Sequence, residues 1–127
     1  MLRAAVWEVK MWIPTPGVKV YIGLGSTDMR KSIDSLGILV SEHLKENVLS
    51  GHLFVFCNRC RTIMKILCWD RNGFCLWHKR LERDKFRWPE SEKDVQEISM
   101  QQLRWLMDGL DIRQARAHGN RNYEYIY

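Results

Sequence analysis

The spacing of apolar residues predicts a short strand and then a long helix in the first fifty residues. Residues 18–22 alternate between apolar and polar side chains, which is the period of a half-buried strand. From Thr27, which suits a helix N-cap, apolar residues recur at helical spacing. These residues are Met29, Ile33, Leu36, Val40 and Leu44. We therefore expect one long helix directly after the first strand.

Three more strands are predicted between residues 53 and 81. Residues 53–56 are apolar at every position, which is typical of a central strand covered on both faces. The next two runs, 62–69 and 74–81, contain the β-branched and aromatic residues that favour strands. Residues 70–73 between them read Asp-Arg-Asn-Gly, and Asn and Gly tolerate the positive φ angles of a tight turn. The order of these runs predicts a β-meander.

The pairing register of the last two strands decides which side chains face the core. If Trp69 lies opposite Phe74, alternation places an entirely apolar set on one face of the hairpin. This set is Met64, Ile66, Cys68, Cys75 and Trp77. We expect that face to be buried, because the other face mixes apolar residues with charged ones.

A second, shorter helix is predicted near the C-terminus. Residues 99–102 match a capping box, and Gly109 suits the end of the helix. The apolar stripe between them consists of Leu103, Leu106 and Met107. Together, the elements predict an α+β fold: a small antiparallel sheet with one long helix after the first strand and a short C-terminal helix.

Composition and charge add a prediction about partners. The chain has 127 residues, of which 46% are apolar and 28% charged, as in an ordinary globular domain. The net charge is +5, but residues 57–87 hold nine Lys and Arg against three Asp and Glu, while residues 88–112 hold two against six. This segregation predicts a localised polyanionic partner.

The sequence also indicates a cellular compartment. No apolar run approaches the roughly 18 residues needed to span a bilayer. Glu8 and Lys10 fall where a signal peptide would be apolar. We expect a cytoplasmic protein whose four cysteines are reduced.

The C-x-x-C motif predicts neither a zinc site nor a redox site. Cys57 and Cys60 form a C-x-x-C motif, but a structural zinc site needs four ligands. The nearby supplements, Cys68, Cys75 and His78, do not have the spacing of a second ligand pair. A thioredoxin-like redox role is disfavoured because the motif lies between predicted strands. We expect neither metal nor cofactor.

A metal-dependent nuclease would need two or three carboxylates in one site. The candidates are Asp28, Asp34, Asp70 and Glu82. Asp28 and Asp34 are six residues apart and do not share a helix face, and Asp70 suits a turn. We therefore expect a protein that is not an enzyme and no pocket where two carboxylates converge; a nuclease is kept as an alternative.

The strongest chemical signal is a stretch of cations interleaved with aromatic residues. The candidate phosphate-contacting residues are Arg59, Arg61, Lys65, Arg71, Lys79, Arg80, Arg83, Lys85 and Arg87. Lys and Arg neutralise phosphates, and a two-stranded ribbon fits the major groove of a duplex. Arg30 and Lys31 form a second candidate patch. The alternatives are a solvated edge ribbon whose charges prevent aggregation, and a surface for an acidic protein.

Several segments, in this order, resemble the TnpB-type accessory protein, the second open-reading-frame product of one family of bacterial insertion sequences. They are GVKVYIGLGSTDMRK (17–31), GHLFVF (51–56), KILCWD (65–70), GFCLWHKRLE (73–82) and FRWP (86–89). An unrelated RNA-guided nuclease shares this name, but nothing in the chain resembles its nuclease fold. Cys57 and Cys60 depart from the family pattern, which has polar or basic residues there.

The resemblance implies a non-catalytic protein that assists DNA transposition beside a separately encoded transposase. Its expected partners are DNA at the element ends and the transposase; a pure protein-interaction module for the transposase is the main alternative. The resemblance covers residues 11–112, so residues 1–10 are expected to be an N-terminal extension or a misassigned start, and residues 113–127 a C-terminal tail.

Overall fold

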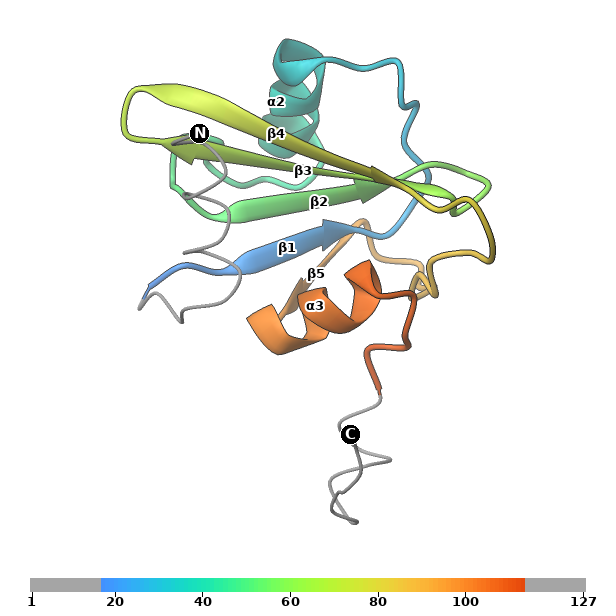
Figure 1. Cartoon of the computed structure of the whole chain (residues 1–127). Coiled ribbons are helices and arrows are strands. Elements are labelled where there is room, and N and C mark those ends of the chain that lie inside the picture. The colour runs from blue at the N-terminus through green and yellow to red at the C-terminus, as the bar shows by residue number, and fades with distance from the viewer. Residues whose placement is uncertain (1–16, 114–127) are drawn as a thin grey trace.

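The computed structural model describes residues 17–113, which form three layers (Figure 1). The elements are β1 (Val20–Gly23), α2 (Ile33–Glu42), β2 (Leu53–Cys57), β3 (Ile63–Asp70), β4 (Gly73–Arg80), β5 (Val95–Ile98) and α3 (Met100–Met107). The middle layer is one sheet with strand order β4-β3-β2-β1-β5. The expected extension, 1–10, and all but the first residue of the expected tail, 113–127, lie outside the described residues.

The predicted meander and its register are confirmed. β2 pairs antiparallel with β3, and β3 pairs antiparallel with β4. Trp69 lies opposite Phe74, as expected. The turn itself is tighter than the four-residue loop assumed, because Asp70 pairs with Gly73 and leaves only Arg71 and Asn72 unpaired. Arg71 takes a left-handed φ of 53° there.

The α+β class is confirmed, but the sheet is mixed and not wholly antiparallel. β1 and β2 run parallel, with Val20 opposite Leu53 and Ile22 opposite Val55. The reason is α2, because a helix between two strands returns the chain to the end where the first strand began. The strand β5, which pairs antiparallel with β1 at the sheet edge, is not predicted from the sequence. Its four residues, Val-Gln-Glu-Ile, are too few for a readable alternation.

Both faces of the sheet are buried, as predicted for the central strand, whereas only one face of the β3–β4 hairpin was expected to be buried. On one face, α2 contributes Leu36, Val40 and Leu44, which pack with Phe54, Phe56 and Leu67. On the other face, α3 contributes Leu103 and Leu106, which pack with the predicted Met64, Ile66 and Cys68. All five residues of β2 are buried, as a central strand requires. Each large apolar side chain buried in this way contributes about 1.5–3 kcal/mol.

The long helix begins later than its apolar spacing predicts. The N-cap is Ser32 and not Thr27. Asp28 and Arg30 account for the delay, because Oδ1 of Asp28 accepts a hydrogen bond from the Arg30 backbone N–H at 2.9 Å. Asp side chains that bond to the backbone two residues later favour turns over helix.

The short helix α3 is bounded as predicted. The Ser99 hydroxyl accepts from the Gln102 backbone N–H at 3.0 Å, and the Gln102 side chain accepts from the Ser99 N–H at 2.9 Å. At the other end, Gly109 has a φ of 82°, and Leu110 donates its N–H to the Trp105 carbonyl at 2.7 Å. Within residues 17–113, neither helix has the length and apolar character that a membrane span requires.

Candidate nucleic-acid interface

The nine candidate cations fall into two groups by exposure. The exposed ones are Arg59, Arg71, Arg80, Arg83, Lys85 and Arg87. The half-buried ones, Arg61, Lys65 and Lys79, donate hydrogen bonds to backbone carbonyl groups. The sequence alone cannot separate these two groups, because it shows the charge of each residue but neither its exposure nor its hydrogen-bond partners.

Five of the exposed cations gather at the open end of the β3–β4 hairpin. There, the turn 58–62 meets the connector 81–94, since Leu81 donates its N–H to the Thr62 carbonyl at 2.8 Å and Phe86 to the Arg61 carbonyl at 2.7 Å. Figure 1 shows this turn and connector together at the right of the sheet. We call the five exposed cations the basic end: Arg59, Arg80, Arg83, Lys85 and Arg87.

Arg71 lies at the other end of the hairpin, in the turn between β3 and β4. β3 has eight residues. At about 3.4 Å per residue, the hairpin tip is about 24 Å from the basic end. The structure therefore does not bring Arg71 together with the other five.

The turn that presents Arg59 is shaped by Asn58. Its side-chain oxygen accepts from the Thr62 N–H at 2.8 Å and from the Ile63 N–H at 2.9 Å. Arg61 takes a left-handed φ of 62° at the same turn. The sequence places these residues between two predicted strands, but it does not identify Asn58 as the residue that holds the turn.

Arg61 joins three segments at the base of the basic end. Its guanidinium donates to the carbonyl groups of Leu24, Gly25 and Asn58, each at 3.4 Å. It also lies over the Trp88 ring, 5.8 Å from the ring centroid. The Trp88 indole in turn donates to the Gly23 carbonyl at 2.8 Å. We call this set of contacts the Arg61 junction, and it fixes the turn and the connector relative to β1.

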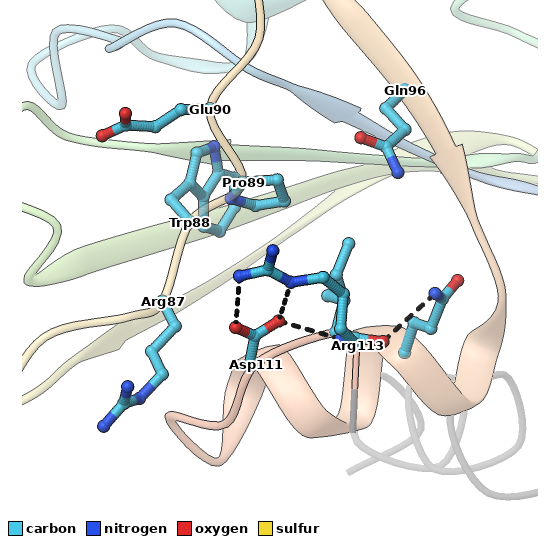
Figure 2. A pocket seen from close by; sticks show the side chains of 9 residues that line it. Arg87, Trp88, Pro89, Glu90, Gln96, Asp111 and Arg113 are labelled. Atoms are coloured by element: carbon cyan, nitrogen blue, oxygen red, sulfur yellow. Dashed lines mark hydrogen bonds and ion pairs between the residues drawn. The ribbon is translucent and has the colours of Figure 1, made fainter. Parts of the chain in front are cut away.

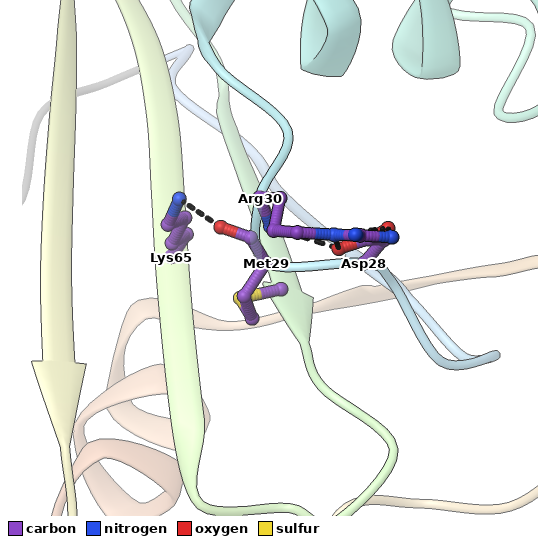
Figure 3. Close-up of polar contacts among 4 residues, drawn as sticks. All are labelled: Asp28, Met29, Arg30 and Lys65. Carbon is purple, nitrogen blue, oxygen red and sulfur yellow. Dashed lines mark hydrogen bonds and ion pairs between the residues drawn. The ribbon is translucent and has the colours of Figure 1, made fainter.

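Lys65 and Lys79 each donate hydrogen bonds to backbone carbonyl groups of distant segments. Lys65 donates from Nζ to the Met29 carbonyl at 2.7 Å and to the Lys31 carbonyl at 3.2 Å, which holds the turn before α2 (Figure 3). Lys79 donates from Nζ to the Met107 carbonyl at 2.7 Å. A cation at the C-terminus of a helix bonds the last carbonyl groups and is favoured by the helix dipole.

The second candidate patch is partly neutralised by its own neighbour. Arg30 forms a two-pronged ion pair with Asp28, at 3.0 Å from Nε to Oδ1 and 2.7 Å from its terminal nitrogen to Oδ2 (Figure 3). Hydrogen bonding to Arg30 holds the pKa of Asp28 well below its usual range. The carboxylate therefore stays charged and offsets the charge of Arg30.

The basic end is less compensated. Arg80 pairs with Glu82 at 3.0 Å, but both side chains are mostly exposed, and such pairs hold little energy. Among the described residues, Arg59, Arg83, Lys85 and Arg87 form no hydrogen bond or ion pair through their side chains. Arg59, Arg83 and Lys85 are thus free to meet anions from solvent, whereas Arg87 also interacts electrostatically with Asp111.

Two grooves adjoin the basic end. The first has a volume of about 430 Å³ and lies between the connector, which contributes Arg83, Asp84, Lys85 and Arg87, and the end of α3, which contributes Asp108. The second, of about 610 Å³, shares Arg87. In Figure 2, Trp88 and Pro89 of the connector and Gln96 of β5 project toward it beside the Asp111–Arg113 pair.

The second groove is electrically balanced. Asp111 accepts from Arg113 at 2.8 Å and 3.1 Å, and these hydrogen bonds lower the pKa of Asp111 to about 2. Two carboxylates, Glu90 and Asp111, line this groove, but Figure 2 shows Glu90 directed away from the Asp111–Arg113 pair. Across the described part of the chain, no three His, Cys, Asp or Glu side chains are grouped so that they could hold a metal ion.

The C-x-x-C cysteines lie in different surroundings. Cys57 is buried in the core beneath the basic end, whereas Cys60 is exposed in the turn. Burial raises the pKa of the Cys57 thiol to about 11, so this thiol is protonated at neutral pH. Cys68 and Cys75 are buried, as expected of strand residues that pack as small apolar groups.

Comparison with known proteins gives a family for this chain. The family described as IS66 Orf2-like protein matches residues 18–117. An uncharacterised protein of Sinorhizobium fredii, y4hO, is 45% identical over 96 residues, which cover 76% of this chain and 84% of that protein. A second uncharacterised protein of the same organism, y4jC, is 30% identical over 102 residues, covering 77% and 84%. No solved structure matches the chain.

Proposed function

This chain belongs to the IS66 Orf2-like family, which is associated with transposition, and we propose that it assists transposition by binding DNA through the basic end. In this proposal the protein is not an enzyme, and the chemistry of strand cleavage and joining belongs to the transposase. The protein's part is to contact the phosphate backbone of DNA at the ends of the element.

One observation carries the proposal: exposed cations that form no side-chain hydrogen bond or ion pair within the described residues converge on one end of the molecule. Arg83, Lys85 and Arg87 line a single groove, and Arg59 projects from the adjoining turn. Asp84 takes a left-handed φ of 64° and bends the chain between Arg83 and Lys85, so the shared groove, and not strand alternation, is what groups the three cations for contacts with a phosphate backbone. The Arg61 junction supports this arrangement by fixing the segments that present them.

The same geometry favours backbone contact over base reading by the hairpin. A β-ribbon that reads bases presents free polar side chains along its face in the major groove. In this hairpin, Lys65 and Lys79 already donate to protein carbonyl groups. Phosphate contacts by themselves position a protein and carry no sequence information. We therefore propose DNA binding with weak sequence preference.

The test is a salt titration of DNA affinity. Five phosphate contacts predict a slope of log K against log salt of about −4.5 on duplex DNA, at about −0.9 per contact. The double variant Arg83→Ala with Lys85→Ala is expected to reduce the magnitude of the slope by about two. The measurement is fluorescence anisotropy with a labelled duplex from the element end, at several salt concentrations.

The matched control is Arg71→Ala, which removes one exposed cation at the hairpin tip. Its slope is expected to equal that of the wild type. Circular dichroism of each variant confirms that it folds. An unchanged affinity and slope in the Arg83/Lys85 variant, with the fold intact, would contradict DNA binding through the basic end.

A further inference from the structure

A groove beside α2 lies on the face of the sheet that packs against this helix. It has a volume of about 370 Å³, and its apolar lining comes from Ile33, Gly37 and Ile38 on the helix, Val48 in the following loop and Phe74 near the hairpin tip. Ile38 is 57% exposed although it sits in the middle of the helix. Leu49, which follows Val48 in the chain, is 53% exposed. Among residues 17–113, these two are the most exposed large apolar side chains.

If α2 packed only against the sheet, its apolar side chains would be expected to face the sheet and to be buried. Leu36 and Val40 do so, and they are fully buried. Ile38 is two residues from each of them, about 200° around the helix, and therefore points away from the sheet. Gly37 lines the groove opposite Val48, and a Cβ added there would make an ordinary contact with Val48 Cγ2 at 3.7 Å. Apolar side chains around an open groove mark an interaction site more often than a single exposed residue does.

The charges around this groove are of one sign. Asp34 and Glu42 line it, one at each end of α2. The helix sequence, IDSLGILVSE, contains no Lys or Arg. An anionic rim around an apolar floor repels DNA and complements a segment that is apolar on one side and basic at its flanks.

We propose that this groove binds an amphipathic helix of a partner protein, with apolar side chains in the groove and Lys or Arg opposite Asp34 and Glu42. This is the helix-in-groove mode of recognition, in which residues at i, i+3, i+4 and i+7 fill the apolar floor. The groove does not include any residue of the basic end, so this inference does not rest on DNA binding. A protein that carries both surfaces could hold DNA and a protein partner at once.

The test uses the full chain and two synthetic 14-residue helices that share one apolar face, the first with Lys and the second with Glu at the polar positions. The Lys helix is expected to bind, and the Glu helix is expected to bind at least ten-fold more weakly. Ile38→Asp is expected to weaken binding of the Lys helix at least ten-fold. Asp34→Lys with Glu42→Lys is expected to reverse the preference between the two helices. The measurement is fluorescence anisotropy of labelled helices.

The matched control is Leu110→Asp, because Leu110 is another exposed apolar residue, 40% exposed, and lies just after α3. It is expected to leave binding of the Lys helix unchanged. Equal binding of the two helices, or equal affinity of the wild type and Ile38→Asp, would overturn the proposal. DNA affinity measured on the same Ile38→Asp sample is expected to be normal, so failure here is distinguishable from failure of DNA binding.

Two other occupants give different results. A second copy of the chain would show as a dimer in analytical ultracentrifugation that Ile38→Asp converts to a monomer. The chain's own residues 1–16 would show as a loss of thermal stability on their deletion that matches the loss caused by Ile38→Asp. Either result would assign the groove to that occupant and overturn the proposal.

Discussion

The two ends of the β3–β4 hairpin differ in charge, although the same two strands form both. The five cations of the basic end lie at the open end of the hairpin, where the Arg61 junction holds the adjoining segments together. The tip carries one exposed cation, Arg71, beside an edge-to-face pair of Trp69 and Phe74 with centroids 5.0 Å apart. Phe74 also lines the groove beside α2, whose rim is acidic.

This difference shows how antiparallel pairing redistributes charge that is spread along the sequence. The strands β3 and β4 run in opposite directions, so the residues before β3 and after β4 meet at the same end. Arg59 and Arg83 are 24 positions apart in the chain, yet they belong to adjoining segments. The tip receives only the two residues of the turn.

Truncation of Trp88, near the open end of the hairpin, and of Trp69, at its tip, should give the largest difference in stability between the two ends. Trp88 is 7% exposed and supports the Arg61 junction, so Trp88→Ala is expected to lower the free energy of unfolding by about 3–5 kcal/mol. Trp69 at the tip is half-buried, and Trp69→Ala should cost on the order of 1 kcal/mol. Urea denaturation followed by circular dichroism measures both. Equal losses would mean that the tip is as firmly packed as the open end.

The cations should separate into structural and solvent-facing ones. Lys79→Met keeps the apolar stem but leaves the Met107 carbonyl without its partner, so a loss of about 1–3 kcal/mol is expected. Lys65→Met should behave in the same way through the Met29 carbonyl. Arg71→Met, the matched control, is expected to stay within about 0.5 kcal/mol of the wild type. The measurement is chemical denaturation at neutral pH. An unchanged free energy of unfolding in Lys79→Met would contradict the division into structural and solvent-facing cations.

The buried thiol under the basic end should make stability depend on pH in the alkaline range. The folded pKa of Cys57 is about 11, above its value of about 9 in the unfolded chain, so the folded state holds its proton more tightly. The stabilisation is complete below pH 9 and is lost as the pH rises toward 11. A difference of about two pKa units corresponds to a stabilisation on the order of 2–3 kcal/mol.

Cys57→Val removes this titration and should flatten the stability profile between pH 9 and pH 11. Cys60→Ser, in the exposed turn, serves as the control and should leave the profile unchanged. Thermal melts at half-unit pH intervals provide the comparison. An identical alkaline slope in the wild type and Cys57→Val would show that the Cys57 thiol does not titrate with folding.

The smallest effect is expected at the Asp111–Arg113 pair beside the basic end. The pKa of Asp111 is lowered to about 2, so its ionised form stabilises the fold above its unfolded pKa of about 3.9, and this contribution disappears as the pH falls toward 2. The Arg113 side chain is 77% exposed, and solvent screens the pair to less than about 0.5 kcal/mol. Asp111→Asn should therefore change acid unfolding only slightly. A loss above about 1 kcal/mol at pH 7 would show that the pair holds the end of the chain in place.

Local patterns in the sequence determine most of the individual elements. The turn at 70–73, the capping box at Ser99 and the continuously apolar β2 are each set by neighbouring residues, and each is predicted correctly. The start of α2 was misplaced by five residues because the Asp28 side chain competes with the helix for the local backbone. Apolar spacing does not register that competition.

The sheet order and the fate of each cation depend on contacts between distant residues. The parallel pairing of β1 with β2 and the edge position of β5 follow from how α2 and α3 cover the two faces. Whether a Lys or Arg reaches solvent is decided by which carbonyl groups the fold leaves within reach of its side chain. Met107 is 28 residues from Lys79 in the chain, and Met29 is 36 residues from Lys65, so local sequence carries no sign of either bond. The positive charge between residues 57 and 87 is thus a property of the sequence, whereas the long-range contacts of the fold select which of these cations can bind an external anion.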